Sequence, residues 1–266
     1  MTRRINVTML GLIIISTLLL SGCAKTTQEN QTVEQKEEVT TTQENQTVEE
    51  KVEITANQEK NEAVEWYYKG NSLYKQGKYS EAIECYNKAI EIDPNYSIVW
   101  YYKGNAYYKQ NIYAEAIECF DKAIELDPNL ANALKSKGYV LFKQSKYSEA
   151  IECFDKSIEM DPNDANIWYM KGEILFLQRE YPEAIECFDK SLEINPNNAT
   201  AWNNKGYLLL KEREYSGALE CFDKSLEINP NNSTAWNNKG HALAFLGRNT
   251  EAEECFDKAR ELGYIG

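Results

Sequence analysis

The sequence is nearly free of histidine and short of basic residues, and each shortage excludes a class of function. His241 is the one histidine among 266 residues, so histidine-rich metal sites are excluded, and any histidine-based catalytic triad would have to use that residue. Lysine and arginine together number 29 against 42 acidic residues, which gives a formal charge of −13. Because no positive surplus is available to neutralise phosphate groups, we expect no nucleic-acid partner.

Motifs of catalysis are missing as well. The chain has no glycine-rich phosphate loop, no nucleophile elbow and no metal-ligand spacing. We therefore predict that the protein is not an enzyme and that it uses no metal and no cofactor.

Residues 1–23 have the pattern of a targeting segment. Arg3 and Arg4 precede an apolar stretch, and the sixteen residues 5–20 are short for a membrane-spanning helix, which needs about 20. The stretch fits the core of a signal peptide. It ends in Leu-Ser-Gly-Cys, which resembles the bacterial lipobox and implies lipidation of Cys23. The alternative is an uncleaved signal anchor, and both predict an extracytoplasmic protein anchored at a membrane of the cell envelope.

Residues 24–62 contain no aromatic residue, no proline and no glycine. They carry ten glutamates against four lysines, and the sequence TTQENQTVE occurs twice in them. Such a segment buries too little apolar surface to offset the entropy lost on ordering. We predict a disordered acidic tether. A coiled coil is the alternative, but the valines and the isoleucine of this segment are too few and too irregularly spaced for one.

The remaining residues, 63–266, repeat with a period of 34 residues. The period is set by six glycines: Gly70, Gly104, Gly138, Gly172, Gly206 and Gly240. In the same frame an aromatic residue recurs sixteen residues after each glycine: Tyr86, Phe120, Phe154, Phe188, Phe222 and Phe256. Each copy holds two amphipathic runs at helical spacing. Since a glycine inside a helix costs about 1 kcal/mol relative to alanine, its recurrence indicates a close crossing of the two helices of a copy.

This pattern of tryptophan, glycine, alanine, aromatic and proline resembles the tetratricopeptide repeat. The resemblance implies an all-α fold, a right-handed superhelical α-solenoid of six 34-residue helix-turn-helix repeats. The repeats are expected at 63–96, 97–130, 131–164, 165–198, 199–232 and 233–266. Hydroxyl side chains are expected to cap the second helices, namely Ser80, Ser148, Ser216 and Thr250.

One cysteine recurs in each repeat: Cys85, Cys119, Cys153, Cys187, Cys221 and Cys255. Equivalent atoms of stacked helix pairs lie about 10 Å apart, whereas a disulfide needs Cα atoms within about 7 Å. We predict free, semi-buried thiols that pack as small apolar residues.

In the resembling family the first helices of successive repeats line a concave groove, which implies a set of partner-binding residues here. The predicted groove residues are Tyr67, Asn71, Tyr74, Tyr101, Asn105, Tyr108, Lys135, Tyr139, Asn203 and Asn237. Tyrosine supplies flat contact area at low entropic cost, and asparagine can hydrogen-bond an extended backbone. Asn71, Asn105 and Lys135 are similar to the carboxylate clamp of the chaperone-binding branch, but the arginine of that clamp is missing.

The sequence therefore predicts a membrane-tethered scaffold that binds a protein or peptide segment in its groove, in envelope assembly or secretion. This setting rests on the resemblance and the targeting segment alone. The alternative is a structural, self-associating spacer without a specific ligand. A third class, binding of a small molecule or glycan by the aromatic groove, has no sequence feature that separates it from the first. A monomer is expected.

Overall fold

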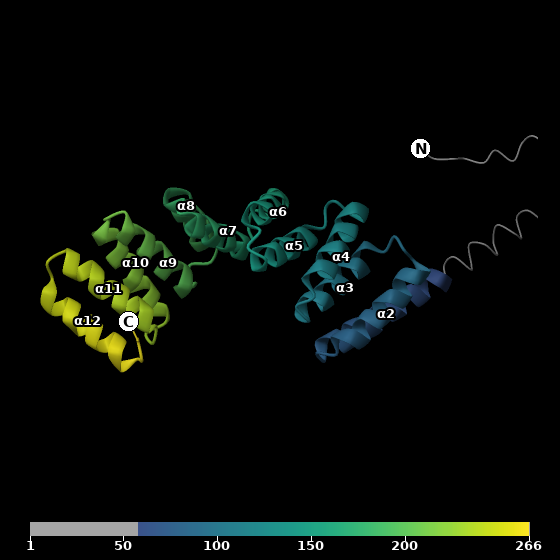
Figure 1. The fold of residues 1–266 in the computed structure, drawn as a ribbon, viewed down its shortest axis with the longest axis horizontal. Coiled ribbons are helices and arrows are strands. Elements are labelled where there is room, and N and C mark those ends of the chain that lie inside the picture. Colours follow the sequence, from purple (N-terminus) through teal and green to yellow (C-terminus); the bar gives the residue numbers. More distant parts are fainter. Residues whose placement is uncertain (1–57, 266) are drawn as a thin grey trace, which may run out of the picture. The chain divides into compact units, whose positions relative to one another are not determined.

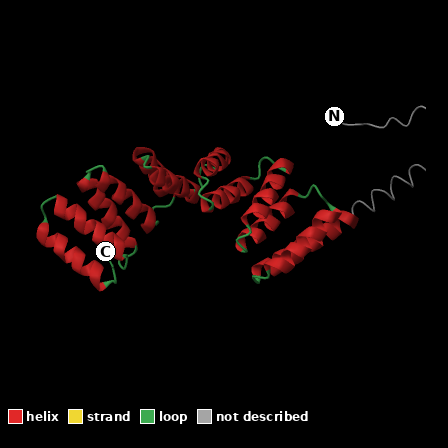
Figure 2. Ribbon diagram, in the orientation of Figure 1, coloured by secondary structure: helices red, strands yellow, loops and turns green. Residues whose placement is uncertain are grey.

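The computed structural model describes residues 58–265, and this part of the chain contains α-helices and no strand (Figure 2). The predicted signal segment, Cys23 and most of the predicted tether lie outside the described residues. The first helix spans 58–75. The others are α2 (Tyr79–Ile92), α3 (Ser97–Lys109), α4 (Tyr113–Leu126), α5 (Ala131–Lys143), α6 (Tyr147–Met160), α7 (Ala165–Gln178), α8 (Tyr181–Ile194), α9 (Ala199–Lys211), α10 (Tyr215–Ile228), α11 (Ser233–Phe245) and α12 (Asn249–Glu261).

These helices form antiparallel pairs, one pair per 34-residue copy, and each pair packs on the next (Figure 1). The helix 58–75 pairs with α2, α3 with α4, and so on to α11 with α12. The unit from Glu59 onwards is thus an all-α solenoid, as the resemblance implied. No helix within 58–265 has the length and apolar character to cross a bilayer.

One predicted boundary is wrong. Residues 58–62, which the sequence assigned to the tether, form the first turns of the helix 58–75. Glutamate and lysine are good helix formers, and the acidic side chains of Glu59 and Glu62 near the helix N-terminus interact favourably with its dipole. The helix therefore begins five residues before Ala63, the first of its residues that is buried.

The core of each repeat is an aromatic ring seated against a glycine. Phe154 is fully buried, and a Cβ atom added to Gly138 would lie 2.5 Å from Cε1 of its ring. The same clash recurs in every repeat. A side chain at this position would displace a ring that has no free space around it. The close helix crossing inferred from the glycine period is confirmed.

The predicted helix caps are wrong. Each of the four hydroxyl residues is the second residue of its helix, and the preceding N-cap residue makes no side-chain capping bond. These helices follow tight turns with a left-handed residue, such as Gly77, so the turn sets where the helix begins. Side-chain caps occur instead on three first helices, where Asp164, Asn198 and Asn232 accept backbone N–H bonds.

A ladder of ion pairs joins successive repeats. The lysine before a motif glycine reaches the aspartate that follows the core aromatic of the preceding repeat. Lys137 lies 2.6 Å from Asp121, and Lys239 lies 2.7 Å from Asp223. Two more pairs complete the ladder, Lys171–Asp155 and Lys205–Asp189. Each partly exposed pair contributes about 0–1 kcal/mol, so the ladder fixes register more than it adds stability.

The six cysteines of the repeats are free thiols, as predicted, and they are buried more fully than the semi-burial expected from the sequence. Burial raises the pKa of Cys119, Cys187 and Cys221 to about 11. Because the thiolate is the reactive form, these residues act as packing groups and not as nucleophiles.

Candidate partner-binding site

The first helices of three consecutive repeats enclose a tyrosine-lined hollow of about 320 Å³. It is lined by Tyr74 of the helix 58–75, by Tyr101, Tyr102, Asn105, Tyr108 and Lys109 of α3, and by Ser136 and Tyr139 of α5. We call this the tyrosine hollow. Five of the ten predicted groove residues meet here, because the 34-residue period places equivalent faces of the first helices side by side.

Burial keeps the hydroxyl groups of Tyr139 and Tyr74 protonated at physiological pH. Burial raises the pKa of Tyr139 to about 12, and its ring packs edge-on against Phe154 with centroids 5.6 Å apart. Burial also raises the pKa of Tyr74. The hollow therefore offers neutral phenols, which both donate and accept hydrogen bonds, together with the ammonium group of Lys109.

Two predicted groove residues at equivalent positions, Asn71 and Asn105, have different surroundings. Asn71 Oδ1 accepts a 2.7 Å hydrogen bond from the hydroxyl of the buried Tyr86. In the next repeat the core aromatic is Phe120, which has no hydroxyl, and the amide of Asn105 makes no hydrogen bond within the described part of the chain. Asn71 thus holds its own repeat together, while Asn105 makes no such bond within residues 58–265.

Two further predicted residues are also occupied by the fold. Lys135 lies 2.8 Å from Asp164, the N-cap residue of α7, and both side chains are largely shielded. Its charge is therefore neutralised, which removes the remaining cation of the clamp-like set. Tyr67 packs against Tyr96 and Tyr102, with ring centroids 5.7 and 5.5 Å apart.

A chain of amides crosses α7, α9 and α11 on the first-helix side. Asn204 donates to Glu173 (2.5 Å) and to the hydroxyl of Tyr169 (3.2 Å). Asn203 donates to Asn204 (3.3 Å) and accepts from Asn238 (3.2 Å). Asn203 is only 8% exposed. Its amide therefore joins its own repeat to the next one through Asn238.

Glu173 makes stability depend on pH. Burial raises the pKa of this carboxyl, and the hydrogen bonds from Tyr169 and Asn204 oppose the shift in part. Since the folded chain then holds the proton more tightly than the unfolded chain, stability falls as pH rises from the unfolded pKa through the folded one.

We expect Glu173→Gln, which keeps an acceptor for Asn204, to flatten this dependence. At neutral pH it should be as stable as the wild type or more stable by up to about 1 kcal/mol, since partial exposure limits the effect. Urea unfolding at a series of acidic to neutral pH values measures this, with the exposed Glu118→Gln on α4 as control. A constant difference between wild type and Glu173→Gln at all pH values would contradict the assignment.

The last predicted groove residue, Asn237, lies in a separate hollow of about 720 Å³. This hollow is formed by α9, α11, the start of α10 and the segments that follow α9 and α12. We call this the C-terminal hollow. Its lining includes Lys211, Arg213, His241 and Phe245. Of the ten predicted residues, five thus line the tyrosine hollow and Asn237 lines the C-terminal hollow.

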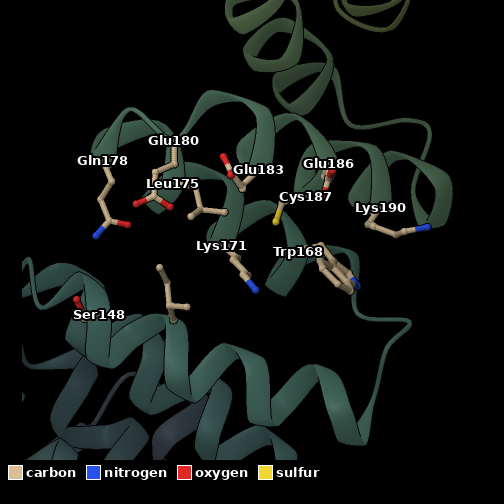
Figure 3. A pocket seen from close by; sticks show the side chains of 11 residues that line it. Ser148, Trp168, Lys171, Leu175, Gln178, Glu180, Glu183, Glu186, Cys187 and Lys190 are labelled. Carbon is tan, nitrogen blue, oxygen red and sulfur yellow. The ribbon is translucent and has the colours of Figure 1, made fainter.

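A third hollow, of about 600 Å³, lies on the second-helix side between α6 and the α7–α8 pair. Figure 3 shows side chains of α7 and α8, among them Trp168, Lys171 and Cys187, at this hollow. Equivalent residues one repeat later, including Trp202 and Cys221, line a smaller hollow of the same kind. Because it recurs with the repeat, we attribute this feature to helix stacking and not to a dedicated site.

The sequence did not identify several of the lining residues. Tyr102 and Ser136 lie two positions before a motif glycine, a position that none of the ten predicted groove residues occupies. Arg213 and Tyr264 lie in turns, outside the helical periodicity. Tyr102 is aromatic, whereas the later copies carry Ser136, Met170, Asn204 and Asn238 at this position. That difference is the signal that could have identified Tyr102.

Comparison with known proteins agrees with this architecture. The described part of the chain is a helical-repeat scaffold. Sequence models of the tetratricopeptide repeat match residues 70–111, 97–130, 119–152, 136–199, 199–232 and 221–254. The chain belongs to the tetratricopeptide repeat family.

Solved structures of this kind are similar over most of their own length. YrrB, described as a tetratricopeptide repeat protein with an unusual peptide-binding site, is 28% identical with a TM-score of 0.63, covering 68% of this chain and 93% of YrrB. MamA is 26% identical with a TM-score of 0.58, and the match covers 60% of this chain and 93% of MamA. PilF of Pseudomonas aeruginosa is 21% identical with a TM-score of 0.66, and the match covers 77% of this chain and 93% of PilF. At that identity the likeness to PilF supports the fold alone. No curated protein matches the sequence.

Proposed function

We propose that the repeat array is a scaffold that binds an extended protein segment across its first helices, with the tyrosine hollow at the centre of the contact. The amide of Asn105 carries this proposal, because it lies among tyrosines and has no hydrogen-bond partner within residues 58–265. Tyrosine rings give rigid contact area, and an amide pairs with a peptide backbone. The likeness to YrrB supports a peptide ligand.

Site-specific photo-crosslinking in the source cells tests this function. A benzophenone side chain replaces Tyr108 in the hollow or, as control, Glu118 on the exposed face of α4. We expect discrete adducts from position 108 and none from position 118. Adducts from position 118 alone would place the partner on the second-helix side. Adducts that contain only a second copy of this chain would favour the self-associating spacer.

We further propose that the array is tethered to a membrane through Cys23, in an envelope assembly or secretion process. The support is the Leu-Ser-Gly-Cys ending of the apolar segment. A single acyl chain binds a bilayer weakly, so more than one chain is expected on this cysteine.

The tether is tested by Cys23→Ser. We expect the variant to remain unprocessed or to leave the membrane fraction, whereas Cys119→Ser, which changes a buried thiol, should leave membrane fractionation unchanged. Mass spectrometry that finds an unmodified Cys23 in an intact N-terminus would refute lipidation.

A further inference from the structure

The C-terminal hollow concentrates positive charge in an acidic protein. The formal charge of the chain is −13, yet no aspartate or glutamate lines this hollow. Lys211, Arg213 and His241 all line it. Neither Lys211 nor Arg213 has an ion-pair partner within residues 58–265, whereas most motif lysines of the array are paired with aspartates. The hollow is therefore complementary to an anion.

Arg213 lies in the tight turn between the two helices of its repeat. Arg213 has φ of 66°, in the left-handed region that disfavours side chains with a Cβ. The equivalent turn residues of the other repeats are Gly77, Asn111, Ser145, Arg179 and Gly247, so the left-handed turn belongs to the repeat and four copies fill it with a residue other than glycine. In this copy the turn places a guanidinium group at the hollow.

The apolar part of the lining is aromatic. Tyr215 and Phe245 are stacked with ring centroids 4.8 Å apart and planes inclined by 10°. Phe245 remains 62% exposed, at the position where four of the other repeats carry a lysine. Lys211 lies 4.9 Å from the ring centre of Tyr207. An exposed aromatic surface beside unpaired cations fits a ligand that carries both a ring and negative charge.

We propose that the C-terminal hollow binds an acidic protein segment carrying an aromatic side chain, with Arg213 and Lys211 pairing its carboxylates and the ring of Phe245 contacting the aromatic residue. This rests on the proposed peptide-binding function and names the chemistry of the partner. Single-stranded nucleic acid has the same combination of ring and charge, but the likeness to YrrB, which is described as having a peptide-binding site, favours a protein segment.

The test uses the full chain and three fluorescent probes of equal length: a peptide rich in aspartate and glutamate with one phenylalanine, its asparagine and glutamine counterpart, and a single-stranded DNA oligonucleotide. At low salt the acidic peptide is expected to bind at least about tenfold more tightly than the other two probes. Its affinity is expected to fall in high salt. Failure of the acidic peptide to bind, or equal binding of its amide counterpart or of the DNA, overturns the inference.

Arg213→Gly removes the cation and also relieves the backbone strain, so it should weaken acidic-peptide binding about tenfold while the melting temperature stays the same or rises. Arg179→Gly is the matched control, because Arg179 has φ of 65° in the equivalent turn one repeat earlier and does not line the hollow. Equal effects of the two variants overturn the inference. If crosslinking from position 108 persists in that case, the proposed function stands without this subsite.

Discussion

Phe154→Ala is expected to lower the free energy of unfolding by about 3–5 kcal/mol, among the largest stability effects in the array. The ring is fully buried and fills the space beside Gly138, and the close crossing of α5 and α6 leaves the helices little room to collapse into the cavity. Urea unfolding of the full chain measures the loss.

The reverse change tests the same contact from the other side. Gly138→Ala places a Cβ 2.5 Å from the ring and should cost about 1–3 kcal/mol, despite the better helix propensity of alanine. In a Phe154→Leu background the cost should shrink, because the ring atoms that clash are gone.

A matched glycine distinguishes crowding from helix propensity. At Gly217 in α10 an added Cβ would meet only Cδ1 of Leu209, at 3.5 Å. Gly217→Ala should therefore be neutral or stabilising by up to about 1 kcal/mol. Equal costs at 138 and 217, or a cost at 138 that persists with leucine at 154, would contradict the crossing mechanism.

Asn105→Ala should reduce crosslinking from position 108 at least tenfold, while unfolding stays within about 0.5 kcal/mol of the wild type. The amide has no partner in the described part of the chain, so its removal strands no internal group. A ligand backbone that pairs with it would lose that bond.

Asn71→Ala should behave in the opposite way. It leaves the hydroxyl of the buried Tyr86 without its acceptor, at a cost of about 1–3 kcal/mol in stability. Tyr86→Phe in the same chain should recover most of this loss, since it removes the stranded hydroxyl. If Asn71→Ala impairs crosslinking from position 108 more than Asn105→Ala does, our assignment of the two amides is reversed.

The candidate site was predictable only in outline. The period placed Tyr74, Tyr108 and Tyr139 on neighbouring helix faces, and the structure brings them into one hollow. The ion pair of Lys135 was not predictable from residue spacing. Its partner Asp164 is 29 residues away and contacts it only when the repeats stack. Turn residues such as Arg213 have no helical periodicity, so no pattern marked them.

The sequence by itself determined the repeat unit, the helix pairs, the glycine–aromatic crossing and the free cysteines. These follow from local periodicity and from contacts within one copy, which every copy repeats. Tertiary structure alone decided which polar groups remain available. Asn71 and Asn105 occupy the same position of the repeat. The hydroxyl of Tyr86, fifteen residues after Asn71, donates a hydrogen bond to it, whereas the equivalent residue beside Asn105 is Phe120, which has no hydroxyl. Whether a polar side chain binds its own fold or a partner depends on the atoms that stacking brings to it, and periodicity does not specify those.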